Sequence, residues 1–434
     1  ARSSQGGERA HGADDAAGAT VTTTTAPDLA TLSDDRAEHA RELYRALHAA
    51  PELSGRERET SARALAHLRA ADAGVRARVG GHGVVGVLRN GEGPVVAVRA
   101  ELDALAVLES TGLPYASSRR TTLGGRQVGV SHACGHDVHV AALLTAVEHL
   151  AAARDAWAGT LVAILEPDEE SGRGAAAMLA DGLARTVPRP DVLLAQHVSP
   201  DPLGAVTIGA GAVLSSSVAL ALTLHGTGGH VAFADDGVDT VAVLLDVLAA
   251  AGDLAREAGA ELTVSAVHGG ASHNTLPHVV RADLVLRGAD AHVLGVVADE
   301  VGVLARHLAD RAGCPRPAEV ERVASFGDVR NEPHAAQRVH RALVGRRVPT
   351  YVLTRPSPAS DDVGALARGL RCPLVYWFLG VSDPALVAEA ALDPRASAAP
   401  ALPGNHAPDF APHPDAVVHA TRALLVAAGA WLAR

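Results

Sequence analysis

The stretch Thr160–Ser171, TLVAILEPDEES, passes from an apolar run directly into a group of acidic side chains. A short, continuous apolar run is typical of a strand that is buried on both faces of a parallel sheet. In open α/β sheets, binding sites form beyond the carboxyl ends of such strands. The stretch therefore predicts an α/β fold with a polar site at Glu166–Ser171.

Segments on both sides of this strand repeat the pattern. Three further apolar runs are interpreted as buried strands: Gly93–Glu101, Asp191–His197 and Leu374–Leu379. Three segments have the apolar spacing of helices: Asp137–Ala153, Gly174–Leu183 and Pro414–Leu432. Because strands that alternate with helices imply a parallel sheet, we expect residues 34–214 and 331–434 to build one α/β catalytic domain.

The pattern changes between about residues 215 and 330. Strand and helix signals there follow in the order β-α-β-β-α-β: Val218–Leu224, Val238–Glu257, Glu261–His268, Val279–Arg287, Val293–Ala312 and Ala318–Ser325. This order is typical of the ferredoxin-like α+β unit. We therefore expect residues 215–330 to form a small domain inserted into the α/β domain.

Composition excludes several classes of protein. A net charge of −11 argues against a nucleic-acid partner, and no apolar run reaches the roughly 18 residues of a membrane span. Three cysteines are too few for a disulfide framework, although a bridge between Cys314 and Cys372 stays open as the less favoured alternative.

The N-terminal segment, residues 1–33, is small and polar, so we expect it to be disordered. The chain begins at Ala1 without methionine. That beginning is compatible with a processed secreted protein and with a cytoplasmic one, so localisation stays open.

Two short motifs carry candidate metal ligands. In His132-Ala-Cys134-Gly-His136-Asp137, the cysteine and the second histidine are two residues apart, which in extended backbone places them on one face. Cysteine and histidine suit zinc-like metals. In Glu169-Glu170, one carboxylate can bind metal while the other moves protons. The alternatives are a buried cysteine beside surface histidines and a solvated acidic loop.

Two single histidines add to these motifs. His197 ends the predicted strand Asp191–His197, and His406 lies in Gly404-Asn405-His406-Ala407-Pro408. A lone histidine is more often an ordinary structural residue than a ligand. All four candidate groups follow strand-like segments, however, and a sheet would bring them to one edge.

From about Leu29 onward the chain resembles the M20 metallopeptidase family, in its amidohydrolase branch of aminoacylases, hippurate hydrolases and auxin-conjugate hydrolases. Beside the motifs above, the resemblance rests on five ordered segments: Leu47-His48…Pro51-Glu52-Leu53-Ser54, Arg99-Ala-Glu101-Leu-Asp103-Ala-Leu105, Gly228-Gly229-His230, Asn274…Pro277…Arg287 and Ser360-Asp361-Asp362.

The resemblance implies two divalent metal ions (zinc, manganese, cobalt or nickel) and a role for each matching residue. Five residues match the metal ligands, with Cys134 bridging the two ions: Cys134, His136, Glu170, His197 and His406. Glu169 matches the general base, and Asp103 matches an acid that orients a ligand or the base. The inserted domain becomes a lid that contacts the substrate through His230, Asn274 and Arg287. Dimeric members pair through this lid and supply the histidine from the partner subunit.

The predicted reaction is metal-dependent hydrolysis of the amide bond of a small N-acyl amino acid, which releases a carboxylic acid and an amino acid. The alternatives are a metallo-dipeptidase or carboxypeptidase of the same family and a binder of acyl-amino acids without turnover. An oxidoreductase is disfavoured, because no G-x-G-x-x-G motif follows a strand.

The chain departs from the family pattern at four places. They are Glu101 in place of Asp, Glu166-Pro-Asp168 in place of Gln-Pro-Ala, and the lid segments Val231–Asp236 and Asn274–His278. None of them removes a ligand or the base. They affect the choice of substrate rather than the type of reaction.

Overall fold

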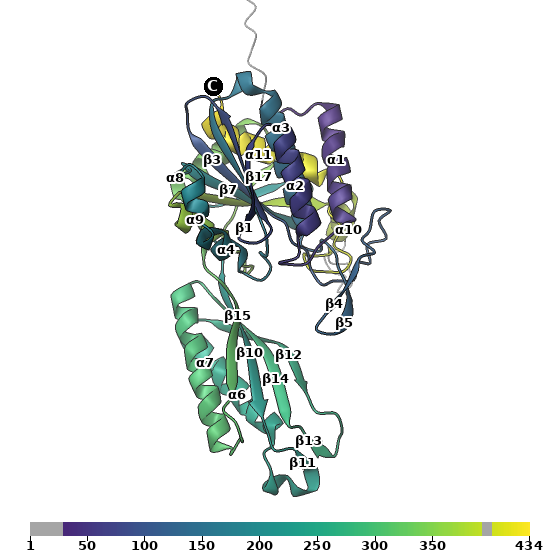
Figure 1. Ribbon diagram of the computed structural model, residues 1–434, viewed down its shortest axis with the longest axis vertical. Coiled ribbons are helices and arrows are strands. Elements are labelled where there is room, and N and C mark those ends of the chain that lie inside the picture. Colours follow the sequence, from purple (N-terminus) through teal and green to yellow (C-terminus); the bar gives the residue numbers. More distant parts are fainter. Residues whose placement is uncertain (1–28, 393–401) are drawn as a thin grey trace, which may run out of the picture.

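The computed structural model describes residues 29–392 and 402–434 (Figure 1). Most of the segment predicted to be disordered, residues 1–28, therefore lies outside the described residues. Its last residues belong to the folded protein, because Leu29 and Ala30 are buried. Ser33 caps helix α1 (Asp34–His48) by accepting a hydrogen bond from the backbone N–H of Arg36.

An eight-stranded sheet in the order β1-β2-β6-β3-β7-β18-β8-β17 forms the larger part of the molecule. Its strands are β1 (Gly74–Val79), β2 (Gly83–Asn90), β3 (Val95–Glu101), β6 (Gly159–Glu166), β7 (Val192–Pro202), β8 (Val206–Ile208), β17 (Thr350–Val352) and β18 (Leu374–Ser382). The four central strands β6, β3, β7 and β18 are parallel to one another, as predicted. The sheet is mixed overall, because β1 and β2 pair antiparallel at one side and β8 runs antiparallel to β18.

Helices cover both faces of this sheet. One face packs against five helices: α1, α2 (Arg58–Ala70), α3 (His136–Ala152), α8 (Pro333–Gly345) and α11 (Ala416–Leu432). The other face packs against three: α4 (Gly174–Ala180), α5 (Leu183–Thr186) and α9 (Val363–Leu370). The predicted helix Gly174–Leu183 is divided into α4 and α5 at Gly182, whose φ is 86°. Helix α3 is buried on all sides over its first three turns, so it is a central element of the core.

The inserted unit is ferredoxin-like, as predicted. Its antiparallel sheet has the order β12-β14-β10-β15 and carries two helices on one face. The elements are β10 (Ser216–His225), α6 (Thr240–Glu257), β12 (Glu261–Gly269), β14 (Val279–Gly288), α7 (Ala291–Arg311) and β15 (Glu319–Phe326). A ribbon of β11 (Gly229–His230) and β13 (Thr275–Leu276), with the 3-10 segment Val231–Asp236, lies at the end of this unit far from the large sheet (Figure 1).

The remaining elements are short. They are β4 (Arg120–Leu123), β5 (Arg126–Gly129), β9 (Gly211–Leu214), β16 (Val329–Asn331), a 3-10 turn at Arg154–Ala156 and α10 (Pro384–Leu392). Cys134, Cys314 and Cys372 are free thiols, so the alternative of a Cys314–Cys372 bridge is wrong. Among the described helices, none is long and apolar enough to cross a membrane.

Candidate metal centre

The candidate ligands gather at the carboxyl ends of the central strands. The backbone ladder between β3 and β7 ends at the pair Arg99–Ala195. Beyond that pair the two strands no longer pair with each other, although β3 continues to Glu101 and β7 to His197. The segment at the start of α3 brings Cys134 and His136 to the same place. This is the edge at which open α/β sheets place their sites.

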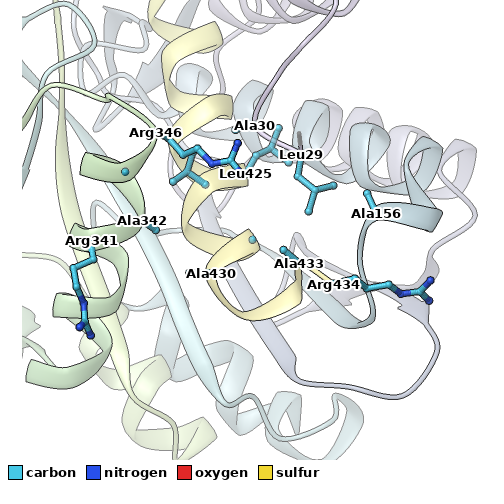
Figure 2. Close-up of a pocket in the computed structure, with 13 residues that line it drawn as sticks. Leu29, Ala30, Ala156, Arg341, Ala342, Arg346, Leu425, Ala430, Ala433 and Arg434 are labelled. Atoms are coloured by element: carbon cyan, nitrogen blue, oxygen red, sulfur yellow. The ribbon is translucent and has the colours of Figure 1, made fainter. Parts of the chain in front are cut away.

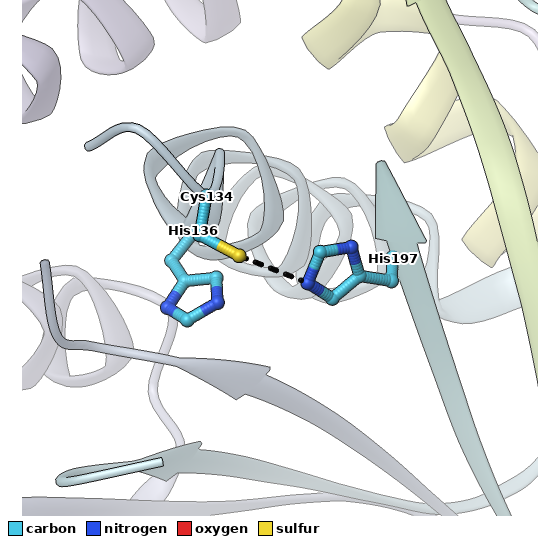
Figure 3. Close-up of side chains that lie close together, drawn as sticks. All are labelled: Cys134, His136 and His197. Atoms are coloured by element: carbon cyan, nitrogen blue, oxygen red, sulfur yellow. Dashed lines mark hydrogen bonds between the residues drawn. The ribbon is translucent and has the colours of Figure 1, made fainter. Parts of the chain in front are cut away.

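Cys134 belongs to two groups of ligand atoms at once. Its Sγ lies 3.4 Å from Nε2 of His197 and 3.3 Å from Nε2 of His406. The ligand atoms of Cys134, His136 and His197 all lie within 4.8 Å of one another, and so do those of Cys134, Glu170 and His406. Figure 3 shows the first group, with the thiol directed towards the ring of His197. The five predicted ligands therefore form two triads that share one sulfur.

Backbone carbonyls orient two of the imidazoles. Nδ1 of His197 lies 2.8 Å from the carbonyl oxygen of Val198, and Nδ1 of His136 lies 3.0 Å from that of Asp103. Because a carbonyl only accepts, each Nδ1 must carry a proton, which leaves Nε2 of the neutral ring as the atom that can offer a lone pair to a metal ion. Hydrogen bonds of this kind orient histidine ligands in metal sites.

Close backbone packing holds the loops that carry Cys134 and His406. Gly135 has φ 86°, and a Cβ atom there would lie 2.3 Å from Val198 Cγ2, so only glycine fits. Asn405 donates hydrogen bonds from Nδ2 to the carbonyls of Cys134 and Val198. The backbone N–H of His406 donates to the carbonyl of Ala133 at 2.7 Å. These contacts join segments that lie far apart in the sequence.

The donor set fits a divalent transition metal. Among the described residues, Nε2 of His136 and Oε1 of Glu170 are buried without a hydrogen-bond partner. Two ligands of one tetrahedral zinc ion, a thiolate and an imidazole, are separated by about 3.5 Å, close to the two sulfur–nitrogen distances here. Buried polar atoms without partners are costly, and a bound cation would satisfy both of them.

The two adjacent glutamates have opposite electrostatic surroundings. Burial, together with the carboxylates of Asp361 and Glu170, raises the pKa of Glu169 well above its usual value. Burial also opposes ionisation of Glu170, but the neighbouring imidazoles of His406, with Nε2 3.5 Å from Oε1 of Glu170, and of His136 outweigh it and lower the pKa of Glu170 to about 2. Environments that separate two carboxylates in this way assign an anionic ligand and a proton carrier.

A buried arginine lies beneath the site. Both Nη atoms of Arg99 donate to the Asp361 carboxylate, at 3.0 and 3.1 Å, and its Nε donates to Glu166 at 2.5 Å. Its Nη groups also donate to Glu101 and, at 3.3 Å, to Asp362. One guanidinium thus donates to four buried acidic side chains, and burial together with repulsion between carboxylates raises the pKa of three of them, Glu166, Asp361 and Asp362.

His139 is a site residue that the sequence analysis missed. Its Nδ1 lies 2.8 Å from Oε2 of Glu101, and its Nε2 accepts a hydrogen bond from the backbone N–H of Val198 at 3.0 Å. Both ring nitrogens are therefore occupied, and His139 holds the backbone beside His197 rather than offering a ligand atom. Its position three residues after His136 on one helix face was the available signal.

Asp103 lies between a ligand and the acidic loop. Its Oδ2 accepts hydrogen bonds from Ser54 Oγ at 2.7 Å and from the backbone N–H of Glu170 at 2.9 Å. Its Oδ1 lies 3.4 Å from Nδ1 of His136. Asp103 is therefore in a position to orient both a histidine and the acidic loop.

Glu57 supports the same acidic loop from below. Its Oε1 accepts hydrogen bonds from the backbone N–H groups of Gly55 and Asp168, at 2.6 and 2.8 Å. Its Oε2 is buried without a partner among the described residues. Burial and the charge of Asp103 outweigh the backbone hydrogen bonds and raise the pKa of Glu57 to about 7.

The three predicted lid residues do not meet in one place. His230 and Asn274 lie on the β11–β13 ribbon, and the ring of His230 packs near Phe233. Arg287 lies at the opposite end of β14, where its Nη1 donates to the carbonyl of Pro358 at 3.4 Å. Eight residues of extended strand separate Val279 from Arg287, or roughly 27 Å.

A separate cavity of about 680 Å³ lies between α8, α11 and residues 29–30 (Figure 2). Its lining is mainly apolar, with Arg341 and Arg434 among the lining residues. None of the candidate ligands lines it. The site is therefore identified by its converging side chains and not by this cavity.

Comparison with known proteins agrees with this geometry. A family model described as peptidase family M20/M25/M40 matches residues 97–398, which is more than half of the chain. The protein belongs to this family.

Individual relatives differ in their names and in how much they match. The N-acetyl-L-cysteine deacetylase of Bacillus subtilis is 32% identical over 258 residues, which cover only 58% of this chain and 59% of that relative. Thermostable carboxypeptidase 1 of Saccharolobus solfataricus is 29% identical over 79% of this chain and 86% of its own.

A solved structure of the same family shares the fold. It is the YXEP protein of Bacillus subtilis, described as a dinuclear metal-binding peptidase of the M20 family. It aligns with a TM-score of 0.68 at 22% identity and covers 91% of this chain and 98% of its own.

We predict that Glu57→Gln stabilises the metal-free protein at pH 8 but not below about pH 4.5. The folded pKa of Glu57, about 7, lies above its unfolded value of 4.5, so the wild type loses stability as the pH rises between these values. Glutamine keeps the accepting oxygen and has no charge to bury. The gain reaches at most about 3 kcal/mol, measured by urea unfolding at both pH values. A gain of equal size at pH 4.5 and pH 8 would contradict the burial of an ionised Glu57.

Proposed function

We propose that this protein is a metal-dependent amidohydrolase that cleaves the amide bond of N-acyl amino acids. The observation that carries the proposal is the pair of ligand triads that share Cys134 beside the buried carboxyl group of Glu169. Membership of the family and the names of its relatives support the reaction class.

We propose that one ion is held by His136, His197 and Cys134, and a second by Glu170, His406 and the same sulfur. Cysteine and histidine favour zinc-like ions, although Mn²⁺, Co²⁺ and Ni²⁺ also suit a mixed set of nitrogen, oxygen and sulfur ligands. When bound, such a pair of ions polarises an amide carbonyl and lowers the pKa of a nearby water. The positive charge of the two ions would also ionise the thiol of Cys134, whose pKa is raised by burial and by Glu170 and Glu169.

Glu169 is the residue to which we assign proton transfer. Its carboxylate lies 3.9 Å from Nε2 of His136, so it faces the ligand cluster without belonging to either triad of shared ligand atoms. It takes the proton of the attacking water and delivers it to the leaving amine nitrogen. The raised pKa that burial causes suits a group that must hold this proton between the two steps.

The substrate class rests on the relatives and on one lid residue. Two kinds of relatives are named deacetylases, of N-acetyl-L-cysteine and of N-acetyldiaminopimelate. Arg287 lies on the exposed face of β14 at the end nearer the large sheet, where its planar fork is in position to bind an amino-acid carboxylate. A carboxypeptidase or dipeptidase, as in the relative from Saccharolobus solfataricus, is the second candidate because it shares the chemistry and the free carboxylate.

We expect the metal-loaded protein to hydrolyse N-acetyl amino acids and to lose this activity on chelation. Glu169→Gln should keep both metals while kcat falls by roughly 10²-fold or more, because only the proton carrier is lost. Glu170→Gln, the matched variant one residue away, should lose metal instead. Release of free amine and the metal content per chain measure the two effects.

Four outcomes count against the proposal. Full activity in metal-free protein would exclude the mechanism, and identical behaviour of the two glutamine variants would exclude the division of roles. Faster turnover of dipeptides with a free amino group than of N-acyl amino acids would favour the second candidate. Binding of acyl-amino acids without turnover would leave only a binding protein.

We predict that Arg287→Ala raises KM for N-acyl amino acids roughly tenfold to a hundredfold, or about 1.5–3 kcal/mol. The corresponding amino-acid amides lack the carboxylate, so their KM should barely change. Arg281→Ala is the matched control, because Arg281 lies exposed on the same face of β14. Equal losses on acid and amide would show that Arg287 does not recognise the carboxylate.

The lid geometry also supports a dimer. His230 and Asn274 sit on the ribbon beyond Val279, and roughly 27 Å of strand β14 separates Val279 from Arg287, so lid closure in one chain cannot bring all three to one small substrate. One face of the lid sheet carries no helix, and the edge strand β12 has exposed Val264 and Val267. We propose that chains pair through this unit, so that His230 of one chain serves the site of its partner by stabilising the developing oxyanion.

Subunit mixing tests this arrangement. Glu169→Gln and His230→Ala should each be nearly inactive alone, whereas their mixture should recover about a quarter of wild-type activity, since half of the dimers are mixed and hold one intact site. Light scattering establishes that dimers form. If the mixture gains nothing although mixed dimers are present, His230 acts within its own chain or not at all.

A further inference from the structure

A second cluster of metal-ligating side chains lies outside the site described above. His39 comes from α1, His67 from α2 and Glu148 from the last turns of α3, and Figure 1 shows these three helices side by side. One ligand atom from each lies within 4.8 Å of the other two. Three separate helices thus direct two imidazoles and one carboxylate at a single point.

The distances between ligand atoms in this cluster are close to the distances between ligand atoms around a bound ion. Nε2 of His39 lies 3.3 Å from Oε2 of Glu148, and Nδ1 of His67 lies 2.6 Å from its Oε1. Ligand atoms around a tetrahedral zinc ion are about 3.4 Å apart. The first distance already fits, and the second is a hydrogen bond that has to open by less than about 1 Å.

The chemistry of the cluster favours one class of ion. Imidazole nitrogens select Zn²⁺, Cu²⁺, Ni²⁺ or Co²⁺ over the hard ions Mg²⁺ and Ca²⁺, which prefer oxygen ligands alone. The side chain of His39 is 44% exposed, which leaves an open side where water can complete the coordination. Burial favours neutral Glu148, but His67, His39 and Arg36 outweigh it and lower the pKa, so the group is an anion.

We propose that His39, His67 and Glu148 form a separate binding site for a divalent transition-metal ion, best suited to Zn²⁺. Twelve residues of α3 separate Glu148 from His136, or roughly 18 Å along the helix, so the site is distinct from the metal centre at the sheet edge. It fastens α1 and α2 to the helix whose first turn carries His136. Its role is therefore structural, because it stabilises the packing of three helices against each other.

Arg36 makes the proposal more specific. Its Nη1 lies 3.7 Å from Oε2 of Glu148, close enough for its charge to repel a metal ion at this point. If the three side chains only formed a network of hydrogen bonds and ion pairs, loss of Arg36 would weaken it. If they form a metal site, loss of Arg36 would make the site bind its ion more tightly.

The experiment counts zinc in the whole protein. Wild type and variants are dialysed against buffers of increasing free Zn²⁺, and zinc per chain and the melting temperature are measured. We expect His39→Ala and His67→Ala each to bind one ion fewer than the wild type and to lose a zinc-induced rise in Tm of roughly 2–5 °C. Arg36→Gln should bind this ion roughly three- to tenfold more tightly.

His334→Ala is the matched control, since His334 makes a single histidine–carboxylate pair with Glu332 on the surface. It should bind as much zinc as the wild type. Equal zinc content in wild type, His39→Ala and His67→Ala would overturn the proposal, as would weaker or unchanged binding in Arg36→Gln. The difference in zinc content between the wild type and each variant does not depend on how much metal the catalytic centre holds. The result is therefore independent of the proposed reaction.

Discussion

The buried guanidinium of Arg99 is the interaction on which the rest of the site depends. It donates hydrogen bonds to Glu101, Glu166, Asp361 and Asp362, which come from two neighbouring strands and from a segment more than 250 residues away in the chain. Removing one partner of a buried ion pair typically costs 3–5 kcal/mol, because the remaining charge is left uncompensated. The network therefore holds the second part of the α/β domain in register with the first. The network also connects to the ligands. Glu101 contacts Nδ1 of His139, and Nε2 of His139 accepts a hydrogen bond from the backbone N–H of Val198, beside His197.

The acidic loop shows how packing assigns different chemistry to identical residues. Glu169 is buried and the adjacent Glu170 is partly buried, yet burial and neighbouring carboxylates raise the pKa of Glu169, whereas neighbouring imidazoles lower that of Glu170. The backbone is held from below by Glu57 and from the side by Asp103, so the two side chains cannot exchange places. Gly172 in the same loop lies against the ring of Phe326 at the end of β15. Motion of the inserted unit would therefore act directly on the loop that carries both glutamates.

The inserted unit keeps apart the residues to which we assign contact with the substrate. Its end near the large sheet presents Arg287, whereas its far end presents His230 and Asn274. Rigid rotation of a unit preserves the distances within it, so a single chain can offer only one of these ends to a given substrate. In the dimer that we propose, Arg287 would therefore recognise a carboxylate in the site of its own chain, whereas His230 would stabilise the transition state in the site of the second chain. Helix α3 makes a comparable connection inside the large domain, with His136 in its first turn and Glu148 in its last turns.

Much of the fold was predictable, because apolar periodicity reports which faces of a local element are buried. The four central strands, helix α3 and the six elements of the inserted unit were all identified in this way. Strands β1 and β2 were missed, and in β2 the residues Gly83 and Gly86 weaken the strand pattern. In the site, Cys134 and His136, and also Glu169 and Glu170, were predictable as pairs because they are neighbours in sequence. The sequence by itself determined these local pairs. Only the tertiary structure decided the contacts of Arg99, His139 and the cluster of His39, His67 and Glu148, because these depend on strand register and helix packing between distant segments.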